Sequence, residues 1–471
     1  MPMRLHDTLT RRLRIVAPLE EGHVRLYTCG PTVYARAHVG NFRTFLFEDI
    51  LHRWLERRFA RVTHVMNLTD VEDKIIRNAA AAGHGLDAET APFIDEFYED
   101  LRTLNIRPAQ HFPRATEYIE EMVALIERLE AAGVAYRSAG SVYYRVAGFP
   151  HYGRLSGARA EGLVAGASGR VDADEYDKED VRDFALWKAV GADEIGWDTR
   201  LGRGRPGWHI ECSAMSMALL GESFDLHCGG VDNIFPHHEN EIAQSEAATG
   251  RQFVQIWCHS AHLRIGGEKM AKSMDNFATV PDLVASGARP SALRYMLAAA
   301  AHYRKPVNYS DESLHAATES VDRLADFDAR VRGHPPRAGE NEARVERIAE
   351  ARSEFGAAMD DDLNLPGAMG TVFSLIRVLN RELDDGELDS ASYSALVGFL
   401  DEVDDVLGVM ELVANERTGN SLSEEDRALL DLRRVARERR EWSESDHLRE
   451  VLADRGIVVE DTGEGQRWRR L

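Results

Sequence analysis

The first part of the chain alternates short strand-like runs with helical periodicity, in the order expected of a parallel α/β sheet. Residues 24–29 alternate apolar and polar side chains and end at a Gly-Pro turn, which predicts a strand. Apolar residues at helical spacing predict a helix over about 43–59, and the β-branched run 62–68 predicts a second strand. Because functional groups gather at the carboxyl ends of such strands, we expect residues 29–41 and 69–73 to lie together.

The middle of the chain interrupts this sheet pattern and then resumes it. The pattern predicts a helix over 115–135, a strand over 141–146 and an exposed insertion, rich in Gly, Ala and charge, over 156–180. Strand-like runs return near 224–226 and 253–259. An inserted segment within a single α/β domain would produce this order.

Helical periodicity dominates from about residue 310 to 413, and the acidic run 360–362 within it predicts a turn. A polar connector follows over 416–425. The tail then combines a predicted helix over 424–440 with a strand-like run at 457–459. We therefore expect a helical domain followed by a small mixed one.

Composition places this chain of 471 residues, with a net charge of −22, among ordinary globular proteins. Such acidity argues against a general coat for nucleic acid, although a local basic patch could still bind one. There is no apolar run of membrane-spanning length, no secretory signal, and too few cysteines (four) for a disulfide framework. We expect a protein of the reducing cytoplasm that does not contact a membrane.

Lysine is rare, and two lysines stand close together. Only six of the 57 basic residues are lysines, and Lys269 and Lys272 lie three residues apart behind a glycine pair. A glycine-led loop with two ammonium groups can close over a polyphosphate and stabilise the charge of a leaving pyrophosphate. Such loops are usually solvated turns, but in a chain so poor in lysine the pair favours a function.

The helix after the first strand begins near the sequence His38-Val39-Gly40-Asn41. The N-terminus of a helix offers N–H groups to phosphate, Gly40 allows close approach, and His38 could donate a hydrogen bond. A Gly-x-Gly-x-x-Gly motif does not follow the strand, so a dinucleotide site of the usual kind is not supported. By themselves, these residues favour a plain polar helix start.

Four residues of metal-binding type are Cys29, Cys212, His237 and Glu241. His237 and Glu241 are four apart and would share one face of a helix. Zinc accepts sulfur, nitrogen and oxygen ligands of these kinds. Because there is no Cys-x-x-Cys spacing, the spacing alone favours two buried thiols and a surface histidine.

Three further residues near these positions are less informative. Cys228 and Cys258 stand in apolar or glycine-rich surroundings and are predicted to be core residues. Trp208 could be a core residue or an aromatic wall beside a substrate.

Arginines crowd the end of the chain, at Arg433, Arg434, Arg437, Arg439 and Arg440 and in the final run Arg467-Trp468-Arg469-Arg470. Arginines with an interleaved aromatic residue suit the phosphates and unstacked bases of RNA. A solvated helix with a frayed end would explain the same residues equally well.

Taken together, these residues resemble the class I aminoacyl-tRNA synthetases and, within that class, the cysteinyl-tRNA synthetase family. The resemblance covers essentially the whole chain and is carried by residues 29–34, 38–41, 67–74, 183–188, 204–215, 235–244 and 269–273 and by the Arg-Trp-Arg-Arg end. The combination is very specific, because coincidence at all these places is improbable.

The resemblance implies roles for individual residues. His38 and Asn41 match the first and last positions of the family's His-Ile-Gly-His signature, and Lys269 and Lys272 match its Lys-Met-Ser-Lys-Ser loop, in which Ala271 replaces a serine. These four are the expected catalytic residues. The expected ATP-binding set is Pro31, Thr32, His38, Gly40, Asn41, Lys269 and Lys272.

The resemblance also implies a metal site, a substrate side and a tRNA contact. The family's zinc ligands fall on Cys29, Cys212, His237 and Glu241, with one zinc ion per subunit and a weak bond from Glu241 or a fifth ligand from the substrate. The expected substrate-side residues are Thr69 and Trp208. The expected tRNA-binding residues are Arg433, Arg434, Arg437, Arg440, Arg467, Trp468 and Arg469.

The implied fold is an α/β Rossmann-like catalytic domain with a connective insertion, then an α-helical bundle and a small mixed anticodon-binding domain. The expected boundaries are 1–110 and 204–309 for the catalytic halves, 111–203 for the insertion, 310–415 for the bundle and 416–471 for the last domain. The implied protein is a monomer that uses ATP with Mg²⁺ to attach L-cysteine to the tRNA specific for cysteine.

Two alternatives remain at this point. A ligase that joins cysteine to a small amino-sugar acceptor would share the catalytic half and the zinc site, but it would lack the region 310–471. A non-catalytic RNA-binding relative would have lost the lysine loop or the metal ligands, and both are present.

Overall fold

The computed structural model describes residues 2–157, 180, 182–265, 268–269, 278–333, 336–384, 388–419, 424–439, 441–455, 457–462 and 465–470. They form two compact units, Met1–Val409 and Met410–Leu471.

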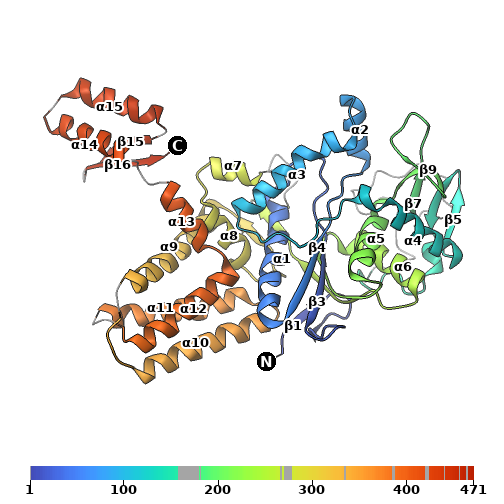
Figure 1. The fold of residues 1–471 in the computed structure, drawn as a ribbon, viewed down its shortest axis with the longest axis horizontal. Helices are drawn as coiled ribbons and strands as arrows, with labels where there is room; N and C mark the ends of the chain where they lie inside the picture. The colour runs from blue at the N-terminus through green and yellow to red at the C-terminus, as the bar shows by residue number, and fades with distance from the viewer. Residues whose placement is uncertain are drawn as a thin grey trace. The chain divides into compact units, whose positions relative to one another are not determined.

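The first unit is built on a parallel sheet of four strands in the order β11-β10-β3-β4. The strands are β3 (His23–Thr28), β4 (Arg61–Met66), β10 (Phe224–Gly230) and β11 (Val254–Ser260). Figure 1 shows α1 (Val39–Arg58) on one side of this sheet and α5 (Trp208–Leu220) and α6 (Glu239–Thr249) on the other. Both faces of the sheet are thus covered, which explains why β10 is buried at every position.

The insertion forms an antiparallel sheet of its own, in the order β5-β6-β7-β9-β8. Its strands are β5 (Ala135–Ser138), β6 (Ser141–Tyr144), β7 (Phe184–Ala189), β8 (Trp197–Thr199) and β9 (Gly202–Pro206). The helices before it are α2 (Asp73–Ala82), α3 (Leu86–Thr103) and α4 (Ile119–Ala131), with short turns η1 (Ala115–Tyr118) and η2 (Val146–Gly148). Most of the predicted exposed segment 156–180 lies outside the described residues.

The remaining parts of the first unit are small strands, two connecting helices and a helical bundle. The strands are β1 (Arg4–Asp7), β2 (Arg12–Ile15), β12 (Leu263–Ile265), β13 (Glu268–Lys269) and β14 (Val307–Tyr309). The connecting helices are α7 (Val280–Ala285) and α8 (Pro290–Ala299), and the bundle contains α9 (Asp311–Gly333), α10 (Glu342–Asp360), α11 (Leu365–Asp384) and α12 (Ser390–Leu407). The turn predicted at 360–362 is confirmed, since it separates α10 from α11.

A buried arginine joins the part that carries the parallel sheet to the helical bundle. Arg294 on α8 is fully buried, and its Nη2 lies 2.5 Å from Asp49 Oδ2 on α1. Its Nη1 donates to Leu104 O at 2.8 Å, and its Nε donates to Leu407 O at 2.5 Å, where α12 ends. A buried guanidinium needs such partners on every side, so these three segments are held together.

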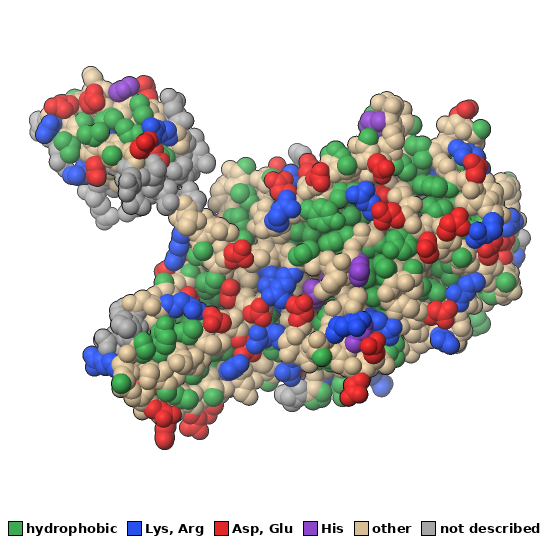
Figure 2. All heavy atoms as spheres, viewed as in Figure 1, with side chains coloured by type: hydrophobic (Ala, Val, Ile, Leu, Met, Phe, Trp, Pro, Cys, Tyr) green, Lys and Arg blue, Asp and Glu red, His purple; other side chains and the backbone are tan. Residues whose placement is uncertain are grey.

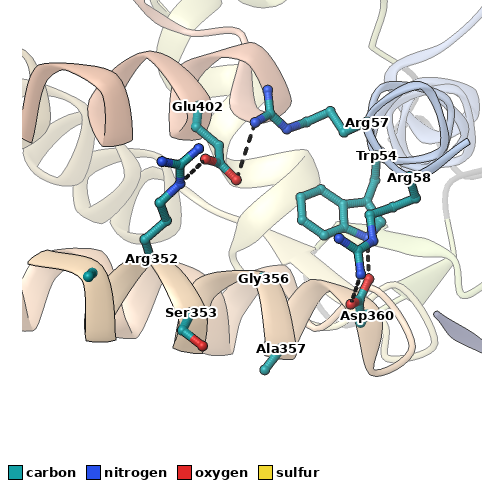
Figure 3. Close-up of a pocket in the computed structure, with 10 residues that line it drawn as sticks. Trp54, Arg57, Arg58, Arg352, Ser353, Gly356, Ala357, Asp360 and Glu402 are labelled. Atoms are coloured by element: carbon teal, nitrogen blue, oxygen red, sulfur yellow. Dashed lines mark hydrogen bonds and ion pairs between the residues drawn. The ribbon is translucent and has the colours of Figure 1, made fainter. Parts of the chain in front are cut away.

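The C-terminal end of α1 meets the bundle at an open cleft of about 620 Å³ (Figure 3). Trp54 forms its floor, and Arg58 pairs with Asp360 at 2.5 Å. Glu402 pairs with Arg57 at 3.2 Å and with Arg352 at 2.6 Å. The arginines that line this cleft pair with the carboxylates of Asp360 and Glu402, and these ion pairs join α1, α10 and α12.

The second unit contains three helices and a hairpin. Its elements are α13 (Met410–Gly419), α14 (Glu424–Glu438), α15 (Trp442–Asp454), β15 (Ile457–Thr462) and β16 (Gly465–Arg470). A small core of Leu430, Leu452, Ile457 and Val459 holds α14, α15 and β15 together. The predicted helix and strand are present, and α15 is an element that the sequence pattern did not indicate. The unit begins at Met410, slightly before the expected boundary.

Charges of both signs are interspersed on the face shown in Figure 2, which agrees with an acidic protein that lacks a general basic coat on that face. Among the residues that the structure describes, none of the helices combines the length and the apolar character needed to cross a bilayer.

One carboxyl group of α1 is buried without a hydrogen bond from the described part of the chain. Glu48 is fully buried, and neither of its side-chain oxygens forms a hydrogen bond with a residue that the structure describes. Burial raises the pKa of Glu48 well above its usual value, so the folded chain holds a proton there that the unfolded chain releases above about pH 4.5. The stability of the protein should therefore fall as the pH rises above that point.

Replacing Glu48 with methionine should remove this loss of stability at high pH. We expect Glu48→Met to raise the free energy of unfolding at pH 8 by about 1–3 kcal/mol, because it removes a buried group that lacks a hydrogen bond. The gain should shrink at pH 5.5. Thermal unfolding at both pH values measures it, with the more exposed Glu56→Met as the matched control. A lower Tm for Glu48→Met at pH 8 would contradict the expectation.

Candidate active site and metal centre

Four buried donors meet where the strands end. The ligand atoms of Cys29, Cys212, His237 and Glu241 all lie within 4.8 Å of one another. Cys29 directly follows β3, Cys212 is on α5, His237 lies in the short turn before α6, and Glu241 lies in the first turn of α6. The structure thus brings together the four residues proposed as metal ligands.

Contacts on both ring nitrogens orient the side chain of His237. His237 lies near the end of the short helical turn η4 (Ile234–His238), one turn before Glu241, and the two side chains approach to 3.2 Å between Nε2 and Oε1. The other ring nitrogen of His237, Nδ1, lies 3.0 Å from Nδ1 of His209. A metal-binding histidine commonly has its second nitrogen held in this way, which orients the ring.

A second group of donors overlaps the first. Cys29, His227, His238 and Glu241 also have ligand atoms within 4.8 Å of one another. Nε2 of His227 lies 3.0 Å from Glu241 Oε2, and Nε2 of His238 lies 3.2 Å from Cys29 Sγ. Sequence reasoning missed these two histidines, although a histidine inside an otherwise apolar strand, as at His227, is a signal that could have found one of them.

A row of hydrogen bonds continues from His238 to residues outside this group. His238 Nδ1 lies 2.8 Å from His259 Nε2, and His259 Nδ1 lies 2.8 Å from Thr8 Oγ1. Trp257 stacks on His227 with ring centres 4.5 Å apart. These contacts fix the orientation of His227 and His238 around Glu241.

The electrostatics of the cluster fit a cation. Burial raises the pKa of the Cys29 thiol, with Cys212 beside it as a second cause, and burial raises the pKa of Glu241 to about 7. Burial lowers the pKa of His227 to about 3, so its ring is neutral. Among the residues that the structure describes, none forms a well-aligned hydrogen bond with Glu241 Oε1, although His237 Nε2 lies 3.2 Å from it. A divalent metal would satisfy that oxygen and favour thiolates beside neutral imidazoles, and two sulfurs, one nitrogen and one oxygen form a donor set that zinc accepts.

The two substrate-side candidates flank this centre. Trp208 stacks on His237 with ring centres 4.3 Å apart and is only partly buried, which favours the aromatic wall. Thr69, just after β4, donates through Oγ1 to Glu211 Oε2 at 3.1 Å. Burial, more than the neighbouring Cys212, raises the pKa of Glu211, and the Thr69 hydrogen bond opposes the rise. The sequence had not indicated Glu211.

The start of α1 contacts the residue that follows the lysine loop in the chain. His38 caps the helix, accepting at Nδ1 from Asn41 N at 3.2 Å, while Asn41 Oδ1 accepts from His38 N at 3.1 Å. Val39 N donates to Ala278 O at 2.9 Å, just after the loop, and β13 forms its other end. Lys272 and the side chain of Lys269 lie outside the described residues.

The helix start predicted at residues 38–41 is confirmed, since α1 begins at Val39 with His38 as its N-cap, whereas the apolar spacing by itself indicated the helix only from about residue 43. The backbone after Cys29 is also tied to the neighbouring strand end, since Pro31 O accepts from Thr69 N at 3.1 Å and Thr32 pairs with Thr69. Pro31 and Thr32 therefore lie beside the end of β4, and Gly40 lies in the first turn of α1.

The arginines of the basic tail differ in their exposure to solvent. Arg433 is 1% exposed and donates to Gln466 Oε1 at 2.9 Å, so it packs inside the second unit and does not present a surface cation. Arg434 is exposed, and Arg437 lies 5.7 Å from the ring centre of Trp442, an exposed aromatic residue that the sequence pattern did not single out. Arg440 and the side chains of Arg467, Trp468 and Arg469 lie outside the described residues.

The buried cysteines Cys228 and Cys258 confirm their assignment to the core. Both are fully buried and free, and they are register partners on β10 and β11. Neither belongs to the two groups of potential metal donors found among the described residues.

A parallel sheet with potential metal donors at its strand ends, an inserted antiparallel sheet and a helical bundle are features of a class I tRNA synthetase. Solved structures show the same fold. Methionyl-tRNA synthetase of Mycobacterium tuberculosis in complex with methionyl-adenylate aligns with a TM-score of 0.62 at 18% identity, covering 84% of this chain and 92% of that one. A ternary complex of Agrobacterium radiobacter LeuRS with tRNA aligns with a TM-score of 0.57 at 11% identity, covering 83% and 84%.

Family comparisons are more specific. The class I (C) tRNA synthetase catalytic domain matches residues 15–319, the DALR domain matches 354–411, and the cysteinyl-tRNA ligase anticodon-binding domain matches 420–469. The cysteine–tRNA ligase of Solibacter usitatus is 43% identical over 470 residues and covers 100% of both chains. That of Alkalilimnicola ehrlichii is 45% identical over 475 residues and covers 99% of this chain and 100% of its own. The chain belongs to the cysteine–tRNA ligase family.

Proposed function

We propose that this protein is an enzyme that joins L-cysteine to the tRNA specific for cysteine in two steps. First, the cysteine carboxylate attacks the α-phosphorus of ATP, forming cysteinyl-adenylate and releasing pyrophosphate. Then a hydroxyl of the 3′-terminal ribose of the tRNA attacks the adenylate carbonyl, and AMP leaves. The observation that carries this proposal is the convergence of thiol, imidazole and carboxylate donors at the strand ends, beside the N-terminus of α1.

For the metal we propose one zinc ion held by Cys29, Cys212, His237 and Glu241. Bound there, zinc supplies a centre that takes a thiolate far more readily than a hydroxyl, which distinguishes cysteine from serine. Four protein ligands are typical of closed structural zinc, so one bond must be weak if the substrate is to bind. Glu241 fits that part, because its other oxygen is already engaged by His227 at 3.0 Å.

For the nucleotide we propose the start of α1 and the lysine loop. Gly40, His38 and Asn41 lie at the positive end of the helix dipole, which favours phosphate. Lys269 and Lys272 would stabilise the charge that develops on the leaving pyrophosphate, and Mg²⁺ would accompany ATP. The hydrogen bond from Val39 N to Ala278 O supports this assignment, because it holds one end of the loop beside the helix start.

For the tRNA we propose the second unit, whose match to an anticodon-binding domain supports the assignment and argues against the amino-sugar ligase. The proposed contacts are Arg434, Arg437, Arg440, Arg467, Trp468 and Arg469. Arg433 is left out because it is buried. That the enzyme is a monomer and works in the cytoplasm are further proposals.

Charging of total tRNA with cysteine and with serine, side by side, tests the function. We expect charging with cysteine to exceed charging with serine by about 10⁴-fold in kcat/KM, since a site that bonds a specific substrate group discriminates strongly. A zinc chelator should abolish cysteine-dependent ATP–pyrophosphate exchange, and added zinc should restore it. Exchange that does not depend on cysteine, or that survives complete removal of the metal, would contradict the proposal.

A further inference from the structure

One row of hydrogen bonds joins the ends of β3 and β4 to the first turn of α5. Thr69 Oγ1 donates to Glu211 Oε2 at 3.1 Å and accepts from Asn67 Nδ2 at 3.2 Å. Asn67 Oδ1 in turn accepts from Gly30 N at 3.1 Å. Gly30 directly follows one cysteine of the proposed metal site, and Glu211 directly precedes the other. The row therefore begins and ends beside the metal ligands.

This row holds Thr69 in one orientation. A threonine hydroxyl has a single proton, which here goes to Glu211, while a lone pair receives the amide of Asn67. The backbone of Thr69 is held as well, because its N donates to Pro31 O and its O accepts from Val33 N, both at 3.1 Å. The side chain and the main chain of Thr69 are thus both fixed.

Glu211 connects Thr69 to the helix that carries a metal ligand. It is 1% exposed and is followed by Cys212 on α5. Successive residues of a helix point about 100° apart, so one turn can direct Glu211 toward Thr69 and Cys212 toward His237. Burying a carboxylate is unfavourable unless hydrogen bonds and nearby positive charge compensate. The first turn of α5 supplies the positive end of a helix dipole, and Thr69 supplies the hydrogen bond.

We propose that Glu211 is a positioning residue for amino-acid selection. Through Thr69 it sets the separation between the head group of the bound amino acid and the metal that takes its thiol. The inference rests on the proposed function, because it places Thr69 on the substrate side and the metal at the cysteine cluster. A fixed separation selects side-chain length: cysteine spans it, whereas homocysteine carries its thiol one methylene further out.

The test compares variants of the full chain in ATP–pyrophosphate exchange. Glu211→Ala should raise the KM for cysteine about tenfold, since the hydrogen bond that holds the Thr69 hydroxyl is lost, and should leave the KM for ATP unchanged. The preference for cysteine over homocysteine should also fall about tenfold, while zinc per chain stays at one. Glu211→Gln should restore most of both values, because its amide oxygen can accept the Thr69 hydroxyl.

Three variants control the test. Thr69→Val keeps the shape and removes the hydroxyl, so it should reproduce the Glu211→Ala shifts without altering α5. Thr69→Ser keeps the hydroxyl and should recover most of the KM for cysteine and of the preference for cysteine that Thr69→Val loses. Glu246→Gln changes another largely buried acid, on α6, whose hydrogen bond is to Phe253 N, and should change neither ratio.

Unchanged KM for cysteine and unchanged preference in Glu211→Ala would overturn the inference. Loss of zinc in parallel with activity would also overturn it, since Glu211 would then support the metal site as a whole. If Glu211→Ala does not fold, Thr69→Val decides in the same way. Failure of the proposed function itself would be seen elsewhere, as an absence of cysteine-dependent exchange in the unaltered chain.

Discussion

Replacing Cys29 with serine should abolish cysteine activation. We expect cysteine-dependent ATP–pyrophosphate exchange to fall by at least about 10³-fold in kcat/KM, because the metal loses a thiolate and the substrate thiol loses its partner. Zinc content measured on the same preparation should fall well below one per chain. Cys29 is the decisive position, since both overlapping groups of donors contain it.

Cys258→Ser is the matched control, because Cys258 is equally buried but belongs to neither group. It should keep its zinc and its exchange activity and lose only some stability. Cys212→Ser and His227→Gln then separate the two groups. We expect Cys212→Ser to lose the metal and His227→Gln to retain it. The reverse result, or equal zinc content in Cys29→Ser and Cys258→Ser, would contradict the ligand assignment.

Removing the second unit should separate the two steps of the reaction. A chain that ends at Val409 should form cysteinyl-adenylate at a rate within about twofold of the full chain, because the strand-end site lies entirely in the first unit. Charging of tRNA should fall at least about 100-fold in kcat/KM, since a second, linked binding surface raises the effective concentration of the tRNA at the catalytic site. Exchange and charging assays on the same preparation measure both.

A charge reversal in the full chain provides the control for truncation. Arg434→Glu changes an exposed residue of α14 and should weaken charging at low salt more than at high salt, as expected of a phosphate contact. Arg439→Glu, on the same exposed stretch but outside the proposed set, tests whether the effect is specific. Equal losses of exchange and charging in the truncated chain would mean that the second unit supports folding of the first.

The metal site illustrates how far the amino-acid sequence can lead. Sulfur, nitrogen and oxygen donors are chemically distinctive, so Cys29, Cys212, His237 and Glu241 could be proposed from their residue types and their resemblance to a family pattern. His227 could not, because a single histidine in an apolar strand is most often a core residue that has found a partner. Only the pairing of β10 with its neighbours and the packing of α6 bring its ring to Glu241.

The basic tail shows what the amino-acid sequence could not predict. Arginine content predicted a cationic surface, but periodicity could not tell which face of α14 would turn inward. The structure buries Arg433 against Gln466 and leaves Arg434 exposed. Neighbouring residues of one helix can therefore be buried and exposed in turn, and composition alone does not distinguish between them.

The sequence by itself determined the broad order of sheet, insertion, helical bundle and mixed tail, together with the family and the donor types, because these depend on local periodicity and on the chemistry of single side chains. Only the tertiary structure decided which groups meet across long separations in the chain. The contact between Thr69 and Glu211, the buried Glu48 and the buried Arg294 are all of this kind. Burial and hydrogen-bond partners are set by neighbours that only folding brings together, and no local pattern encodes them.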